Sequence, residues 1–489
     1  MSFYIYDIIF LVAFSLAVGI FLYKRRKNLK KEGLLYLYRT QVGIRFIDYV
    51  GEKYKKAISF FAFLAIISGY LLMASMVYLF YKLIYIYLFV PEIVKAIKIP
   101  PLMPLIPYLP EAFNIDFLPP FYFTYWIIAI AVIALFHEFA HGIVARRYNV
   151  KILTTGFGFL GPFLAAFVEP DEHQMVKKPK YQQIAILSAG VFTNLILALI
   201  FFLLMSLVFV TAYLPSGALF NTYTIGEVPI KNIEAIDGKI ITDSSREGIL
   251  RLIEDNNITN DLVLGSNGKS INLTKVIANN KTYYITVDKL KLQLDNNKIL
   301  LYEDLPAINV GLRGSIVAIN ENKIEDYEDL TEVMKMYKPG DVVKITTIDT
   351  TEGKRETLKY EVVLAEDPYE KGRAVIGIGY LSTRESVLGQ ITDTFNFFKK
   401  PATHYEAKFN GDLILFIYNL IWWLAIINFS VALINMLPMG IFDGGRMFML
   451  TVWSITGNEK IAQKSFKFAT YFILVVLVLI MAGWIIAIF

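Results

Sequence analysis

The sequence predicts a multi-pass α-helical membrane protein of about six spans, with an inserted β-rich, α+β region that lies outside the membrane. Of its 489 residues, 55% are hydrophobic, which is more apolar surface than a soluble fold of this length buries. Apolar runs of about 20 residues, the length that crosses a bilayer, recur along the chain. Between two of them, residues 214–382 combine short β-branched runs with turn signals such as SNGK and KPGD.

The apolar runs give the expected positions of the spans, which are residues 2–22, 57–81, 121–144, 184–213, 412–437 and 468–488. The first run is expected to stay as a membrane anchor, because its basic cluster Lys24–Lys27 follows the run and no small-residue cleavage site is present. Residues 92–120 are rich in proline and poor in charge, so we expect a loop along the membrane surface.

Positive charges beside the spans predict the orientation, since Lys and Arg concentrate on the cytoplasmic side. Lys24–Lys27 place the end of the first span in the cytoplasm, and the arginine pair at 146–147 then falls there as well. The lysines at 177–180 agree, whereas the pair at 399–400 falls on the outer side. The polar region 214–382 is therefore expected outside the cell membrane.

The motif HEFAH places ionisable side chains at the end of the third span, where such residues are costly and mark function. His137 and His141 are one helical turn apart and point the same way, at a spacing suited to one zinc ion. Glu138 lies about 100° further round the helix, within reach of a water on that metal. Two imidazoles with a glutamate base form the metallopeptidase arrangement.

A third ligand must come from elsewhere in the chain, and it must be a carboxylate. The chain has no cysteine, and no histidine follows His141 closely enough for a three-histidine pattern. One candidate group is Glu169, Asp171 and Glu172, and the other candidate is Asp443. Span parity brings Asp443 to the same side of the membrane as the histidines, and the two glycines after it permit a tight turn near a metal. Asp443 is therefore the preferred candidate.

These residues resemble the site-2 protease family of intramembrane zinc metalloproteases over about 121–213 and 412–456. The resemblance rests on HEFAH, on SAGVFTN in the fourth span and on NMLPMGIFDGG after the fifth. It implies one Zn²⁺ per chain held by the two histidines and Asp443, with Glu138 as the base. The segment GFGFLGPFLAAFVEPDE is similar to the family's membrane-associated β segment.

Two asparagines in these motifs are candidates for binding substrate or the transition state. A substrate helix must unwind to be cut, so the enzyme must supply hydrogen-bond partners for its backbone. Asn435 is expected to clamp an extended substrate, and Asn194 to stabilise the tetrahedral intermediate. The alternative for both is hydrogen bonding between helices. Pro438 is expected only to end its helix. At Gly190-Val191 the chain departs from the Gly-Pro that is common in the family.

Residues 301–382 resemble a PDZ domain of the bacterial protease type, because "GSIVAIN", a following helix and "KPGD" occur in PDZ order. A weaker copy of the pattern occupies 214–300, where a generic β insert is the alternative. A PDZ groove binds extended peptides by strand addition. The resemblance therefore implies that peptide or protein ends bind outside the membrane.

The predicted organisation has seven parts. They are N-terminal anchor spans with a surface loop (1–120), the first part of the catalytic core (121–213), a possible first PDZ-like domain (214–300), a PDZ-like domain (301–382), an amphipathic linker (383–411), the second part of the core (412–456) and a C-terminal span (457–489).

The function that these features favour is a zinc-dependent intramembrane metalloendopeptidase that cuts transmembrane segments of other proteins in regulated intramembrane proteolysis, as the resemblance implies. Its expected partners are transmembrane substrates, peptide ends and the lipid bilayer. A nucleic-acid partner is not expected, because no basic face is visible. The alternatives are a CAAX-type membrane zinc protease with a nearby glutamate ligand and a proteolytically silent PDZ scaffold. The scaffold has no need of Glu138.

Overall fold

The computed structural model describes residues 3–33, 35–90, 100, 103–113, 115, 118–160, 163–260, 262–265, 271–350, 355–381 and 396–488. The chain divides into two compact units. One comprises residues 1–209 and 412–489, and the other comprises residues 210–411. Part of the predicted surface loop at 92–120 and residues 383–395 of the predicted linker lie outside the described residues.

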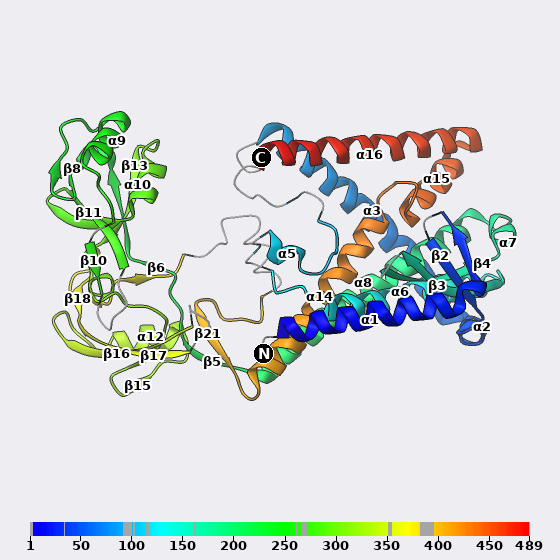
Figure 1. Ribbon diagram of the computed structural model, residues 1–489, viewed down its shortest axis with the longest axis horizontal. Helices are drawn as coiled ribbons and strands as arrows, with labels where there is room; N and C mark the ends of the chain where they lie inside the picture. Colours follow the sequence, from blue (N-terminus) through cyan, green and yellow to red (C-terminus); the bar gives the residue numbers. More distant parts are fainter. Residues whose placement is uncertain are drawn as a thin grey trace. The chain divides into compact units, whose positions relative to one another are not determined.

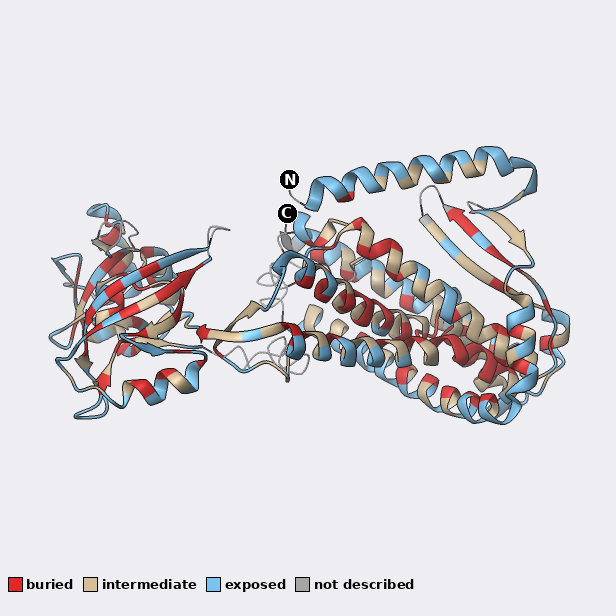
Figure 2. Cartoon of the chain, turned by 90° about the horizontal axis from the view of Figure 1, so that it is seen from below, coloured by how far each residue is buried: buried red, intermediate tan, exposed pale blue. Residues whose placement is uncertain are grey.

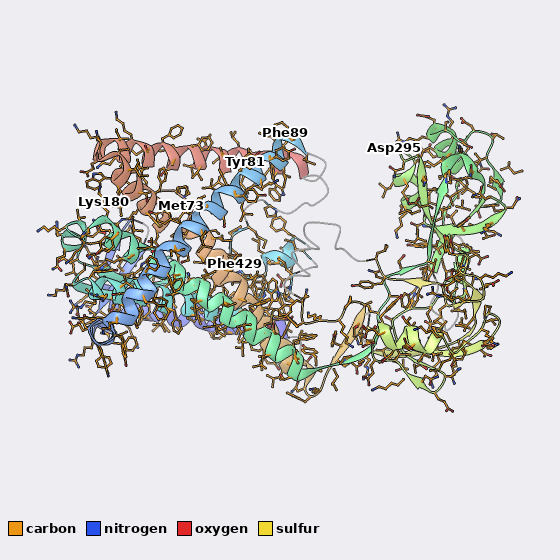
Figure 3. All side chains as sticks on the ribbon, turned by 180° about the vertical axis from the view of Figure 1, so that it is seen from behind. Met73, Tyr81, Phe89, Lys180, Asp295 and Phe429 are labelled. Carbon is orange, nitrogen blue, oxygen red and sulfur yellow. The ribbon has the colours of Figure 1, made fainter. Side chains whose placement is uncertain are left out.

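Six helices are long and apolar enough to cross a membrane, as the sequence predicted. They are α1 (Phe3–Arg25), α3 (Lys55–Phe89), α6 (Phe123–Arg147), α8 (Lys180–Ala212), α14 (Gly411–Asn435) and α16 (Glu459–Ile488). Large side chains on several of them are exposed, among them Tyr81, Phe89 and Phe429 (Figure 3). Figure 2 shows that α1 is exposed along most of its length. Apolar surface of this extent identifies a multi-pass membrane protein.

The last span is longer than the sequence predicted, and a further helix precedes it. The chain leaves α14 through a turn at 436–442 and then forms α15 (Asp443–Thr456), a helix of 14 residues that is too short to cross a membrane (Figure 1). Gly457, in the left-handed conformation with φ 67°, ends α15. The helix α16 then begins at Glu459 rather than near residue 468.

A four-stranded antiparallel sheet accompanies the membrane helices, with strand order β1-β2-β3-β4. Its strands are β1 (Leu29–Glu32), β2 (Leu35–Thr40), β3 (Ile152–Leu160) and β4 (Phe163–Pro170). The hairpin that follows α1 thus joins the hairpin that follows α6, and β4 forms an edge of the sheet. The short helix α7 (Glu172–Val176) follows β4.

The amphipathic helix α2 (Ile44–Lys53) fixes the end of α6 next to this sheet. The Arg146 guanidinium of α6 lies 2.6 Å from carboxylates of both Asp48 and Glu52 of α2. The core of this unit gathers where α6, α8, α14 and α15 meet, and includes Val144, Leu187, Ala432 and Met447. The HEFAH motif therefore lies on a helix that is held at its end and packed against α8.

The second unit contains two sheets with separate hydrophobic cores. The strands of the first, in order, are β7 (Ile225–Pro229), β13 (Lys298–Glu303), β12 (Lys281–Ile285), β11 (Ile271–Ala278), β8 (Ile233–Ile236) and β9 (Lys239–Ile240), with β10 (Leu262–Leu264) beside β11. Its helices are α9 (Arg246–Asp255) and α10 (Val287–Gln293).

The second sheet includes strands from beyond the range predicted for the PDZ-like domain. In order, its strands are β17 (Glu356–Val363), β16 (Val342–Asp349), β14 (Ser315–Ile319), β5 (Tyr213–Ala218) and β21 (Thr403–Ala407), with β15 (Asn322–Lys323) beside β14. Two short strand pairs, β6 (Thr222–Tyr223) with β20 (Ile378–Gly379) and β18 (Ala365–Glu366) with β19 (Ala374–Val375), and the helices α11 (Pro306–Asn309) and α12 (Tyr327–Met334) accompany it. Because β5 and β21 come from 214–300 and 383–411, neither neighbouring segment is separate from this sheet.

Candidate metal centre

The two histidines of HEFAH converge on one point. His137 and His141 lie one turn apart on α6, and their Nε2 atoms are 3.0 Å from each other. The rings stand edge to face, with centroids 4.6 Å apart. His137 is only 7% exposed. Two imidazole nitrogens are thus directed at a single position in a site that is largely shielded from solvent.

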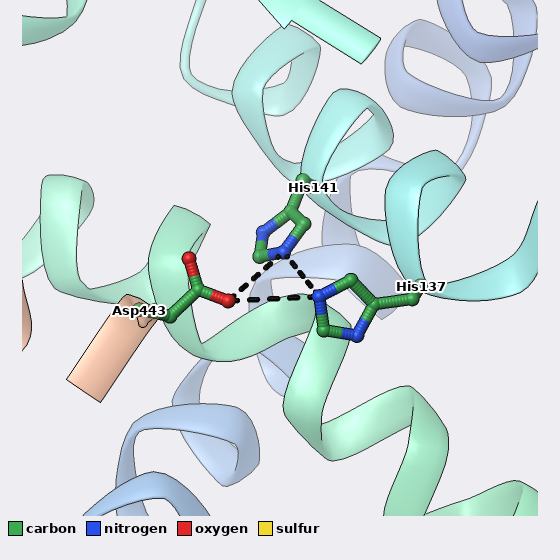
Figure 4. A group of neighbouring side chains, drawn as sticks. All are labelled: His137, His141 and Asp443. Atoms are coloured by element: carbon green, nitrogen blue, oxygen red, sulfur yellow. Dashed lines mark hydrogen bonds and ion pairs between the residues drawn. The ribbon is translucent and has the colours of Figure 1, made fainter. Parts of the chain in front are cut away.

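Asp443 completes a group of three potential ligands. Its Oδ2 atom lies 3.5 Å from His137 Nε2 and 3.4 Å from His141 Nε2 (Figure 4). One ligand atom from each of the three residues lies within 4.8 Å of the others. Two nitrogens and one carboxylate oxygen are the donor set of a catalytic zinc site with one open position. The donor chemistry and the convergence therefore fit Zn²⁺.

The two glycines after Asp443 allow α15 to approach the turn closely. A Cβ atom on Gly444 would collide with the backbone of Met436, and one on Gly445 would collide with the Met439 carbonyl. From the sequence, these glycines were expected to let the backbone approach a metal. In the structure they let the first turn of α15 pack on residues 436–439, which positions Asp443.

Residues on one face of α8 contact the two histidines. The Ile186 carbonyl oxygen lies 2.6 Å from His141 Nδ1, and the Asn194 side-chain amide lies 3.0 Å from His137 Nδ1. Gly190 lies between them, four residues from each, and a Cβ there would be 2.7 Å from His137 Nε2. This face of α8 thus supplies one partner for each Nδ1 atom and leaves space for the two Nε2 atoms.

Glu138 is held beside this group by the sheet. Its Oε2 atom accepts a hydrogen bond of 3.0 Å from the backbone N–H of Val168 in β4. The carboxylate is therefore held where α6 meets the edge strand β4, and its other oxygen, Oε1, does not take part in this bond.

Comparison with known proteins places the chain in a family. The sequence profile of peptidase family M50 matches residues 125–481, which include all three potential ligands and Glu138. The chain belongs to peptidase family M50. The resemblance to site-2 proteases that the motifs predicted is confirmed, and so is the expected class of metallopeptidase.

The sequence of this M50 family member is also similar to that of a zinc metalloprotease. Zinc metalloprotease RasP of Shouchella clausii (strain KSM-K16) is 26% identical over 223 residues, which cover 39% of this chain and 51% of the relative. The chain thus spans about half the length of that protein.

Two cavities of this M50 family member meet at the candidate metal centre, and His137, Glu138 and Asn435 line both. The apolar cavity, of about 430 Å³, lies between α6, β4 and α14, with walls that include Trp126, Ile130, Ile133, Leu164, Ile427 and Val431. The polar cavity, of about 570 Å³, also reaches His141 and Asp443, and its charged lining comprises Glu32, Arg39, Glu169, Glu172 and Arg446. Asn194 lines neither cavity.

The nearby carboxylates that were alternative ligands have other partners. Glu169 accepts a 2.7 Å hydrogen bond from Thr154 and pairs with Arg39 at 3.2 Å, and these contacts hold its pKa below the usual value. Asp171 caps α7 through the N–H of Gln174. Glu172 pairs with Arg446 at 3.1 Å. Within the described residues, the potential metal-ligand group contains Asp443 and none of these three.

Asp7, which contacts the first residues of α6, was not predicted from the sequence. This carboxylate of α1 is buried and accepts hydrogen bonds from the N–H groups of Phe123 and Thr124 at 2.7 and 2.9 Å. The hydroxyls of Thr124 and Tyr108 also donate to it, each at 2.5 Å. Asp7 therefore caps the N-terminus of α6 from another helix. Its position as the one charged residue within 2–22 was an available signal.

Proposed function

We propose that this chain is a zinc-dependent intramembrane endopeptidase that cleaves transmembrane segments of membrane proteins. One Zn²⁺ per chain is held by His137 Nε2, His141 Nε2 and Asp443 Oδ2. The observation that carries this proposal is the convergence of these three atoms at the end of a membrane-spanning helix, beside Glu138. When bound, zinc polarises a peptide carbonyl and lowers the pKa of a water ligand.

Glu138 is the general base. Val168 holds Oε2, which leaves Oε1 free to take the proton of the attacking water. The same carboxyl group then returns that proton to the nitrogen of the leaving amine. The proposal therefore requires a carboxylate at position 138, because an amide accepts no proton.

The edge of β4 and the apolar cavity support an extended substrate at the site. A transmembrane helix satisfies its own backbone hydrogen bonds, so it must unwind before a peptide bond reaches Glu138. An edge strand offers unpaired backbone groups to such a segment. The apolar walls accept its side chains, and Asn435, which lines both cavities, is placed to bind its backbone.

Asn194 orients His137. If His137 binds the metal through Nε2, its Nδ1 carries the proton and needs an acceptor. The Asn194 Oδ1 atom is buried and has no hydrogen-bond partner among the described residues, and it becomes that acceptor when the side-chain amide is rotated by 180°. Asn194 is 0% exposed and lines neither cavity, so these contacts favour an orienting role over the predicted contact with the tetrahedral intermediate.

The second unit presents a groove suited to peptide ends. A cavity of about 630 Å³ lies between α12 and the segment 374–378, lined by Leu330, Met334, Val375 and Ile376 among others. A helix facing an extended segment is the arrangement in which PDZ domains bind peptides, and this supports a PDZ-like role for residues 301–382. The groove would admit substrates shortened by a prior cleavage, as regulated intramembrane proteolysis requires.

The positive charges of the loops favour an orientation with the metal centre towards the cytoplasm and the second unit outside the cell membrane. Because the chain has no cysteine, Asn322→Cys and Asn28→Cys variants report on the two sides. An impermeant maleimide should label the first variant and spare the second in intact cells, and the reverse pattern would invert the orientation.

Glu138→Gln tests the proposed activity. The amide keeps the shape of the side chain and leaves the three ligand atoms in place, so the purified variant should retain zinc and lose cleavage. Membrane proteomes of cells with wild type and variant should differ by uncut membrane stubs. A Glu138→Gln protein that cleaves a model transmembrane substrate at the wild-type rate would remove Glu138 from the mechanism.

A further inference from the structure

A third cavity of the membrane unit, apart from the metal centre, has walls of a different kind. It measures about 610 Å³ and lies between α3, the turn after α14, α15 and the first half of α16. Its apolar lining includes Val77, Phe80, Leu437, Pro438 and Ile473. None of the residues that line it belongs to the metal centre, so it is not part of the route by which a peptide bond reaches Glu138.

One part of this cavity is positively charged. Lys464 and Ser465 supply its polar lining, and Lys460, Lys464 and Lys467 lie on one stripe of α16 because they are four and three residues apart. All three lysines are exposed, and in the described parts of the chain no carboxylate forms an ion pair with them. Among the described residues, this row of cations at the start of an apolar helix thus has no carboxylate partner.

Aromatic side chains continue from the lysines along the cavity. Phe468 and Phe472 stand one turn apart on α16, with nearly parallel rings whose centroids are 6.1 Å apart. Both line the cavity and are largely exposed. In a bilayer leaflet, lysines lie at the headgroups, aromatic residues at the interface and aliphatic residues beside the acyl chains. The lining of this cavity follows the same order.

We infer that this cavity binds an anionic phospholipid of the bilayer, with its phosphate at Lys464 and an acyl chain against Phe80, Leu437 and Ile473. The apolar walls fit a hydrocarbon chain, and the lysine charge selects an anionic headgroup over a zwitterionic one. A transmembrane substrate is the less suitable occupant, because no proposed metal ligand and no edge strand is among the residues that line the cavity.

The bound lipid also stabilises the turn at 436–442, which leads into Asp443 at the start of α15. Leu437 and Pro438 of that turn form part of the cavity wall, and Met439 and Phe442 pack in the same hydrophobic cluster as Phe80 and Ile473. An acyl chain that fills the cavity therefore packs against the segment joining Asn435 to Asp443. An effect of the lipid on activity rests on the proposed function, because it requires Asp443 to bind zinc. Binding of the lipid does not depend on the proposed function.

Native mass spectrometry of the full-length protein tests the binding directly. The protein is purified in detergent with equal amounts of phosphatidylglycerol and phosphatidylcholine. The mass of the complex then identifies which lipid is retained and in what amount. Wild type should retain one phosphatidylglycerol with a preference of about fivefold, the effect expected of one lysine near an anionic headgroup. Lys464→Glu should lose the preference, and Ala469→Leu, which narrows the cavity, should retain less of either lipid. Lys56→Glu, an exposed lysine that does not line the cavity, is the matched charge control.

The outcomes separate the proposal from its rivals. Equal retention of the two lipids by wild type, or an unchanged preference in Lys464→Glu, would overturn the site. Displacement of the retained lipid by an equimolar transmembrane substrate peptide would assign the cavity to substrate instead. Phosphatidylglycerol should also slow deuterium exchange in residues 436–442 of wild type and not of Lys464→Glu. If wild type binds phosphatidylglycerol but residues 436–442 exchange as fast as they do in Lys464→Glu, the coupling between the lipid and the turn would be overturned.

Discussion

The side-chain amide of Asn194 on α8 lies 3.0 Å from Nδ1 of His137 on α6, a nitrogen that points away from Asp443. The opposite nitrogen of the ring, Nε2, faces His141 and Asp443. A residue in the fourth span thus contacts the side of the His137 ring that does not face the other two potential ligands.

Replacing Asn194 should weaken metal binding. Asn194→Ala removes the partner of His137 Nδ1, so zinc affinity should fall about 10- to 100-fold in a chelator competition assay. Asn194→Asp keeps an acceptor and should retain affinity near that of wild type. Thr193→Ala, whose hydroxyl bonds only the Ala189 carbonyl, is the control on the same helix. Unchanged affinity in Asn194→Ala, with a lower kcat alone, would favour contact with the transition state.

Gly190 should be intolerant of a side chain. A methyl group at this position would meet both imidazole rings, so Gly190→Ala should bind zinc at least about tenfold more weakly although every ligand is present. Gly19→Ala on α1, where nothing lies within 4 Å of the added atom, controls for the general effect of alanine in a membrane helix. Equal zinc affinity in the two variants would show that α8 does not confine the histidines.

Removing the Asp7 carboxylate should destabilise the membrane unit. Asp7→Ala leaves the N–H groups of Phe123 and Thr124 and the Tyr108 hydroxyl without their acceptor, which should lower the free energy of unfolding by about 3 kcal/mol. Denaturant unfolding in detergent measures the change. Ser15→Ala on the same helix is the control. An unchanged unfolding midpoint in Asp7→Ala would mean that the Asp7 carboxylate does not stabilise the start of α6.

The pairing of β5 with β21 provides cut points for removing the second unit. Ala218 and Thr403 are paired residues, so a short Gly-Ser linker can replace residues 219–402 and join the two strands as a hairpin. Zinc content should stay at one ion per chain, because every proposed ligand lies in the other unit. Cleavage should extend to substrates with larger outer domains. A folded deletion variant without zinc would show that the second unit supplies a ligand.

The membrane spans and the pair of histidines could be predicted from the sequence, because they follow from the length of apolar runs and from helical periodicity. Apolar runs located the six spans, and the spacing of four residues placed His137 and His141 on one face. Span parity favoured Asp443, which the structure brings to within 3.5 Å of both histidines.

The remaining features depend on contacts between distant segments, which no local pattern records. Neither the orientation of Asn194 towards His137 nor the cap that Asp7 forms on α6 follows from spacing within one helix. The pairing of β5 with β21 likewise joins residues about two hundred positions apart in the chain. The helix α15 has 14 residues, fewer than a membrane span needs, and its packing on residues 436–439 is seen only in the structure.

The identity of the third ligand is the most direct test of the central claim. Two imidazoles alone make a site too open to hold zinc firmly, since catalytic sites have three protein ligands and one water. Asp443→Ala and Glu169→Ala, purified in detergent, are compared for metal content by mass spectrometry and for cleavage of a model transmembrane substrate. Asp443→Ala should lose most of its zinc and all activity, whereas Glu169→Ala should keep one zinc per chain. Stoichiometric zinc in Asp443→Ala together with metal-free Glu169→Ala would contradict the proposed centre.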